Sequence, residues 1–82
     1  MKTITILKNM FKQKFGIKEE NLLDDEQILQ LINSLDFAEC ICELEEFFEI
    51  EILDGEIYGT ITIKELADLV DEKLNEKEAE LQ

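Results

Sequence analysis

Residues 31–52 read LINSLDFAECICELEEFFEIEI and carry the strongest structural pattern of the chain. On a helical wheel with about 100° per residue, its four largest core candidates fall within about 60° of one another. They are Phe37, Ile41, Leu44 and Phe48. We therefore predict a helix that begins near Ser34, ends near Glu49 and turns this apolar face toward a core.

The same predicted helix carries a second, smaller apolar row on its opposite side. This row has the helical spacing i, i+3, i+7 and consists of Leu35, Ala38 and Cys42. Carboxylates surround it: Glu39 and Glu46 on one flank, Glu45 and Glu49 on the other, with Asp36 and Glu43 beyond. An apolar strip framed by acids suits the docking of a basic partner. The alternative is that Leu35 packs under a loop and the acids form an ordinary solvated face.

Outward from this helix, the N-terminal side predicts another helix and then a loop. Residues 3–15 place Ile4, Leu7, Phe11 and Phe15 at helical spacing, and Gly16 is typical of a helix end. Residues 17–33 show no sustained period but include several leucines and isoleucines. We expect them to form a long ordered loop that is pinned to the core.

On the C-terminal side, two glycines interrupt IEILDGEIYG, residues 50–59, which leaves room for one short helical turn. Thr62 and Glu65 then form a capping box at the start of a last helix, whose apolar face continues to Leu74. We expect residues 76–82 to fray. The predicted fold is all-α: residues 1–82 form a single domain, a small four-helix bundle with three main helices, one short helix and a long loop between helices one and two.

Composition limits the functions that this chain can have. Among its 82 residues, 8 basic and 21 acidic ones give a formal charge of −13, and 45% are hydrophobic. So negative a surface disfavours nucleic acid and anionic lipid and favours partners that present Lys and Arg, although the charge could also serve solubility alone. No apolar run approaches the roughly 20 residues of a membrane span, and we see no signal peptide. Cys40 and Cys42 point away from each other on a helix, so we expect no disulfide and a cytoplasmic location.

The chain lacks the groups that would make Ser34 a catalytic nucleophile. It contains no histidine, and Ser34 has no G-x-S-x-G context. The acid clusters do not have the spacing of a calcium loop, so we expect no metal site and no enzymatic activity. Ser34 can be a modification site, or Asn33 or Ser34 can be the helix N-cap. Both interpretations hold together if Asn33 is the cap.

Residues 31–52 resemble the acyl carrier proteins, in which D-S-L-D is followed by an acidic amphipathic helix with L-E-E and then by F-x-I-x-I. TITIKELADLV, residues 60–70, resembles the last helix of that family. The resemblance implies that Ser34 carries 4′-phosphopantetheine, received from coenzyme A and held through a phosphodiester. It further implies that acyl or aminoacyl groups travel as thioesters on this arm to enzymes of fatty-acid, polyketide or related specialised synthesis.

The resemblance also implies a set of partners and a surface on which they dock. The partners are a phosphopantetheinyl transferase and acyl-loading, synthase and transferase enzymes with basic patches, which meet a monomeric carrier. The docking residues carried over from the family are Leu35, Asp36, Ala38, Glu39, Cys42, Glu45 and Glu46. The alternative function is an unmodified interaction module that acts through the same acidic helix.

Two positions depart from the family pattern. Asn33 replaces the usual aspartate before the serine, and Gln30 stands where many stand-alone members have glycine. Both changes leave the hydroxyl in place, and three consequences are open: slower modification, recognition by a different transferase, or a specialised carrier outside housekeeping fatty-acid synthesis.

In many members of the family the acyl chain folds back between the helices. Here such a cavity would be lined by Phe37, Ile41, Leu44, Ile57 and Ile63.

Overall fold

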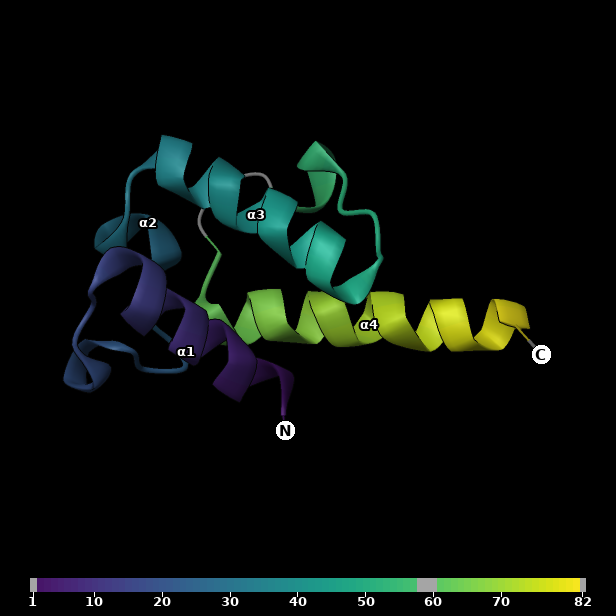
Figure 1. Cartoon of the computed structure of the whole chain (residues 1–82), viewed down its shortest axis with the longest axis horizontal. Helices are drawn as coiled ribbons and strands as arrows, with labels where there is room; N and C mark the ends of the chain where they lie inside the picture. Colours follow the sequence, from purple (N-terminus) through teal and green to yellow (C-terminus); the bar gives the residue numbers. More distant parts are fainter. Residues whose placement is uncertain (1, 58–60, 82) are drawn as a thin grey trace.

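The computed structural model describes residues 2–57 and 61–81, and throughout these ranges the regular elements are helical (Figure 1). In chain order they are α1 Thr3–Phe15, η1 Glu19–Asn21, α2 Ile28–Leu31, α3 Ser34–Phe48, η2 Asp54–Glu56 and α4 Ile63–Leu81. The described residues contain no strand, only an isolated bridge between Gln27 and Thr62. The predicted all-α class, a small four-helix bundle, is confirmed.

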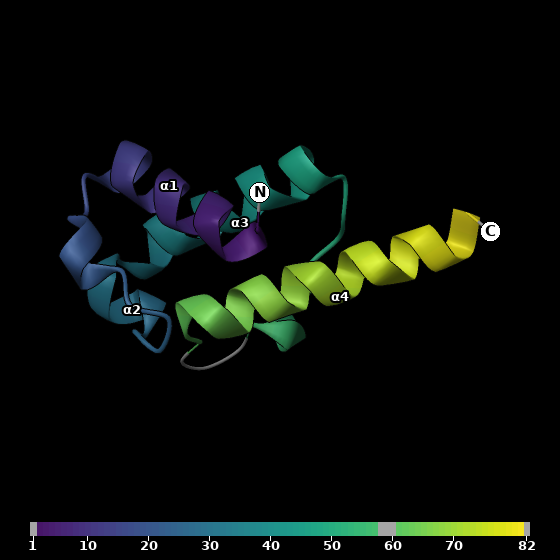
Figure 2. The same ribbon diagram turned by 90° about the horizontal axis from the view of Figure 1, so that it is seen from below.

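Helix α1 has the bounds that its apolar spacing predicted, and it ends at Gly16. This glycine has φ 66°, a left-handed conformation that residues with a Cβ avoid. Its backbone N–H donates to the carbonyl of Lys12 at 3.1 Å and closes the last turn. Buried Leu7 and Phe11 lie on the inner face of α1, which packs against α4 (Figure 2).

The connection from α1 to α3 is ordered and is pinned to the core, as predicted, and it also forms hydrogen bonds with the start of α4. Ile28 N–H donates to the carbonyl of Ile61 at 2.9 Å, and Ile63 N–H donates to the carbonyl of Glu26 at 3.1 Å. Leu22 and Ile28 are buried beneath this connection. The sequence analysis did not predict η1 and α2 within it, because three or four residues are too few to show a helical period.

Helix α3 turns its predicted apolar face inward. Phe37, Ile41 and Leu44 are buried, and Phe48 is half-buried at the edge of the core. The buried core of the described residues draws on every α-helix and on the connections between them. It comprises Leu7, Phe11, Leu22, Ile28, Ile32, Phe37, Cys40, Ile41, Leu44, Ile52, Ile61, Ile63, Leu66, Ala67 and Val70.

Beyond α3 the chain makes the short turn η2 near Gly55, as expected, and then enters α4 through the predicted capping box. Thr62 Oγ1 accepts from Glu65 N–H at 3.1 Å, and Glu65 Oε1 accepts from Thr62 N–H at 2.9 Å. The C-terminal part of α4 projects past the rest of the bundle (Figures 1 and 2), whose longest extent is 40 Å. Helix α4 continues as far as Leu81, and residue 82 lies outside the described ranges. A static structure does not test whether the end of a helix frays, so the expected fraying of residues 76–82 stays a prediction.

None of the helices found in residues 2–57 and 61–81 is long and apolar enough to cross a bilayer.

Candidate functional site

Ser34 is the first residue of α3, and its side chain is exposed. Of the two N-cap candidates, the structure selects the residue before it: Asn33 Oδ1 accepts a hydrogen bond from the backbone N–H of Asp36 at 2.7 Å. Because Asn33 provides the cap, the helix does not need the Ser34 hydroxyl. Within the described ranges this hydroxyl has no hydrogen-bond partner, so it is available for reaction.

The start of α3 fits a phosphate ester on Ser34. The first backbone amides of a helix and its dipole favour a negative group at the N-terminus, and α3 has 15 residues over which the dipole builds up. The cap is a neutral amide, so no carboxylate directly precedes Ser34. The residues present there therefore suit the phosphodiester end of a 4′-phosphopantetheine arm.

The second apolar row of α3 faces solvent. Leu35 is 79% exposed, and Ala38 and Cys42 are also exposed. The alternative in which Leu35 packs under a loop is therefore wrong, because Leu35 lies on the outer side of α3, opposite the core face. An exposed leucine of this size next to Ser34 forms an apolar contact point that the fold itself does not use.

The four acids assigned to docking have different surroundings. Glu45 is half-buried, and its Oε2 accepts from the backbone N–H of Ile52 at 2.9 Å, so it holds the chain that follows α3. Asp36 is half-buried in the first turn, and Glu39 forms an ion pair with Lys14 at 3.6 Å. Only Glu46 is exposed with no partner among the described residues.

Lys14 is a neighbour of this surface that sequence reasoning missed. Its ammonium group donates to Glu43 as well as pairing with Glu39, and the hydrogen bond to Glu43 raises the pKa of Lys14 above 10.5. Its side chain lies in the last turn of α1, where a cation complements the helix dipole. The sequence predicted both helices, but not that Lys14 of α1 would lie beside Glu39 and Glu43 of α3.

The two cysteines have unlike surroundings, and both are free thiols. Cys42 is exposed on the outer row, whereas Cys40 is fully buried beside Met10, to whose Sδ its thiol donates at 3.5 Å. Burial raises the pKa of Cys40 from 9.0 to about 12, and nearby Glu43 adds to the effect. Cys40 is therefore a core residue.

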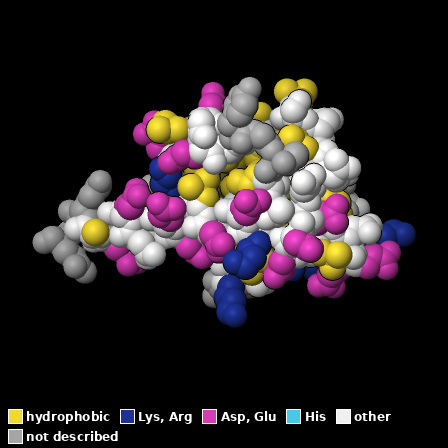
Figure 3. Space-filling model, turned by 180° about the vertical axis from the view of Figure 1, so that it is seen from behind, with side chains coloured by type: hydrophobic (Ala, Val, Ile, Leu, Met, Phe, Trp, Pro, Cys, Tyr) yellow, Lys and Arg dark blue, Asp and Glu magenta, His cyan; other side chains and the backbone are white. Residues whose placement is uncertain are grey.

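Carboxylates are spread over the surface without converging on a metal site. Seen from behind, acidic side chains lie along the lower half and at the upper left of the visible face, and lysines are fewer (Figure 3). Across residues 2–57 and 61–81, no three His, Cys, Asp or Glu side chains are placed to hold a metal ion. The acids there can steer a basic partner but do not form a cluster that would bind a cation.

Comparison with known proteins identifies what these features resemble. A family model described as a phosphopantetheine attachment site matches residues 5–70, most of the chain. This match includes Ser34 and every residue assigned to docking.

Individual relatives agree with the family match. The chain is similar to two proteins named acyl carrier protein from Buchnera aphidicola subsp. Acyrthosiphon pisum, strains Tuc7 and APS. Each is 33% identical over 69 residues, which cover 82% of this chain and 86% of the relative. The similarity therefore spans nearly the whole of both molecules.

Proposed function

The chain belongs to the acyl carrier protein family, whose attachment domain holds 4′-phosphopantetheine covalently, and on that premise we propose that it bears this arm on Ser34 and delivers acyl groups to partner enzymes. The observation that carries the proposal is the Ser34 hydroxyl itself. It is exposed at the N-terminus of α3 and left without a hydrogen bond among the described residues, because Asn33 caps the helix.

The chain's own residues would support delivery in three ways. The amides at the start of α3 stabilise the phosphodiester on Ser34 Oγ. Exposed Leu35 offers an apolar contact beside it, and Glu46, which has no ion pair within the described ranges, offers its carboxylate to a lysine or arginine of the partner. When bound, the arm supplies a terminal thiol that holds the acyl group as a thioester.

The finer features of the function belong to the same proposal. The cargo is an acyl or aminoacyl group of fatty-acid, polyketide or related specialised synthesis. The partners are a phosphopantetheinyl transferase and loading, synthase and transferase enzymes with basic patches, and the carrier itself is a monomer without catalytic activity. Two free thiols, one of them exposed, support a reducing, cytoplasmic location. An acyl cavity between the helices belongs to the same proposal: of its expected lining, Phe37, Ile41, Leu44 and Ile63 are buried in the core, and Ile57 packs against the core half-buried.

A single reaction separates the carrier from an unmodified interaction module. The protein is incubated with a broad-specificity phosphopantetheinyl transferase and an acyl-coenzyme A, and its intact mass is measured before and after neutral hydroxylamine. A carrier gains the mass of arm plus acyl group, and hydroxylamine removes only the acyl part because it cleaves thioesters. Ser34→Ala should gain nothing. If the wild-type mass stays unchanged while a known carrier is loaded under the same conditions, the interaction module becomes the better account.

A further inference from the structure

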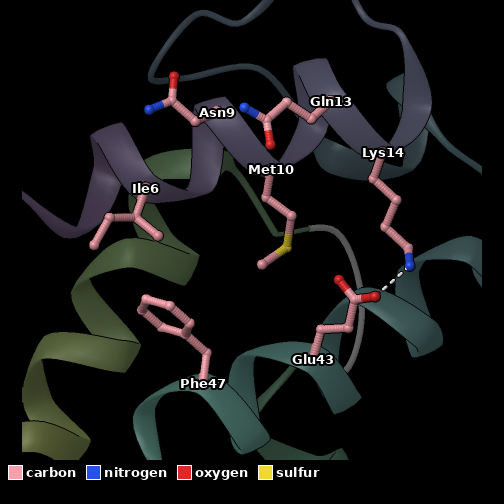
Figure 4. A pocket seen from close by; sticks show the side chains of 7 residues that line it. All are labelled: Ile6, Asn9, Met10, Gln13, Lys14, Glu43 and Phe47. Carbon is pink, nitrogen blue, oxygen red and sulfur yellow. Dashed lines mark hydrogen bonds and ion pairs between the residues drawn. The ribbon is translucent and has the colours of Figure 1, made fainter.

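A groove of about 520 Å³ lies between α1 and the C-terminal half of α3, away from Ser34 (Figure 4). Ile6 and Met10 extend into it from α1, Phe47 faces them from α3, and the Lys14–Glu43 pair closes one end. Ser34 and Phe47 are thirteen residues apart on α3, which corresponds to about 20 Å along a helix. The groove is therefore a surface separate from the proposed attachment site.

The apolar side chains that form the two walls of this groove are each fixed by a contact with a neighbouring side chain, and the space between the walls stays open. Phe47 is 65% exposed, and its ring stands edge-on to Phe48 with 4.9 Å between ring centroids. On the opposite wall, the Sδ atom of Met10 accepts a hydrogen bond from the Cys40 thiol. An exposed aromatic ring beside a half-buried methionine, both on an anchored framework, is typical of protein interfaces.

The charge around the groove indicates what kind of partner fits. Glu39, Glu43 and Phe47 follow one another at i, i+4 and i+8 and so form one row along α3. The Lys14 ammonium group pairs with both carboxylates, Glu39 and Glu43. Because one positive charge faces two negative ones, the row keeps a net negative charge. A second copy of this chain would bring its own charge of −13, and a fatty-acid carboxylate would also be repelled. A cationic partner is attracted.

We propose that this groove binds an amphipathic helix of a partner protein that carries Lys or Arg beside its apolar face. One or two of its apolar side chains lie between Met10 and Phe47, because the groove spans about two turns of α1 and one of α3. Its cation takes a position at Glu43 or Glu39, where Lys14 now lies. Binding does not require an arm on Ser34.

The test uses two synthetic peptides of about 18 residues, one with leucines on one face and lysines on the other, and one with every leucine replaced by alanine. Both are titrated into the full Ser34→Ala chain, which cannot be modified at this site, and NMR shifts are recorded. We expect leucine-dependent shifts centred on Ile6, Met10 and Phe47. Phe47→Ala should weaken binding about five-fold or more, as for a central aromatic contact, whereas Leu53→Ala, an exposed apolar residue outside the groove, should not.

Several outcomes would overturn the proposal. One is equal binding of the two peptides, which would show attraction by charge alone. Shifts confined to Leu35, Ala38 and Cys42 would place the peptide on the outer row instead. Shifts at Met10 and Phe47 with decanoic acid but not with the leucine peptide would make the groove an acyl site. Self-association in sedimentation that Phe47→Ala abolishes would make it a contact between copies. Because Ser34→Ala is used throughout, none of these results depends on whether Ser34 is modified.

Discussion

Asn33 leaves the hydroxyl of Ser34 available because Asn33, and not Ser34, caps α3. Its side-chain oxygen satisfies the Asp36 N–H, which would otherwise need the hydroxyl of Ser34 or water. Asparagine and aspartate can both accept this bond, so the departure from the usual aspartate changes charge but not capping. We infer that Asn33 preserves the exposed hydroxyl while removing one negative charge beside it.

Replacing Asn33 tests this interpretation. Asn33→Ala should lower the free energy of unfolding by about 1 kcal/mol, because the cap is lost. Asn33→Asp keeps the acceptor and should leave stability near that of the wild type or slightly above it. Urea unfolding followed by circular dichroism measures both. Equal midpoints for the alanine variant and the wild type would show that the cap does not stabilise α3.

Cys40 predicts how stability changes with pH. Its pKa is raised from 9.0 to about 12 in the folded protein, so the folded state keeps a proton that the unfolded state loses above pH 9. The contribution of this thiol is fully present below pH 9 and is lost as pH rises toward 12, with a slope of at most about 1.4 kcal/mol per pH unit.

Cys40→Ala isolates this effect. The variant should be less stable than the wild type at pH 8 because it leaves a small cavity, and the difference should shrink as pH rises from 9 to 11. The measurement is urea unfolding under a reducing agent at each pH. A difference that stays constant from pH 8 to pH 11 would mean that the thiol is not protected from ionisation.

At the scale of the elements, α3 combines three tasks on different sides: core packing, the outer row beside Ser34 and the groove against α1. Its acids divide accordingly, since Glu45 secures Ile52, Glu39 meets Lys14 and Glu46 is unpaired among the described residues. The sequence analysis treated these three glutamates alike. Their partners lie on other segments, so periodicity along one helix could not distinguish them.

Glu46 should therefore contribute most to steering. We expect Glu46→Lys to slow phosphopantetheinyl transfer by about five-fold at low salt, and less at high salt, because exposed charges act mainly on association. Glu78→Lys makes the same charge change on the projecting part of α4 and serves as the matched control. Initial rates by mass spectrometry give the comparison, with circular dichroism to verify helicity. Equal rates for the two variants would assign the effect to net charge rather than to this face.

At the scale of the whole molecule, the sequence predicted what depends on neighbouring residues and missed what depends on distant ones. The bounds of α1, the start of α3 and the Thr62–Glu65 box follow from spacing, a glycine and capping chemistry. The short α2 carries no period of its own. The groove exists only because α1 and α3 lie side by side, which no local pattern indicates.

The proposed arm is attached at one atom, Ser34 Oγ, and Ser34 is the only serine of the chain. The most direct test of this attachment is the mass of the protein after incubation with coenzyme A and a broad-specificity phosphopantetheinyl transferase, with fragmentation to locate the change. We expect a gain of about 340 Da on the fragment that contains Ser34, and no gain in Ser34→Ala. An unmodified wild-type chain, or an equal gain in Ser34→Ala, would contradict the proposed attachment.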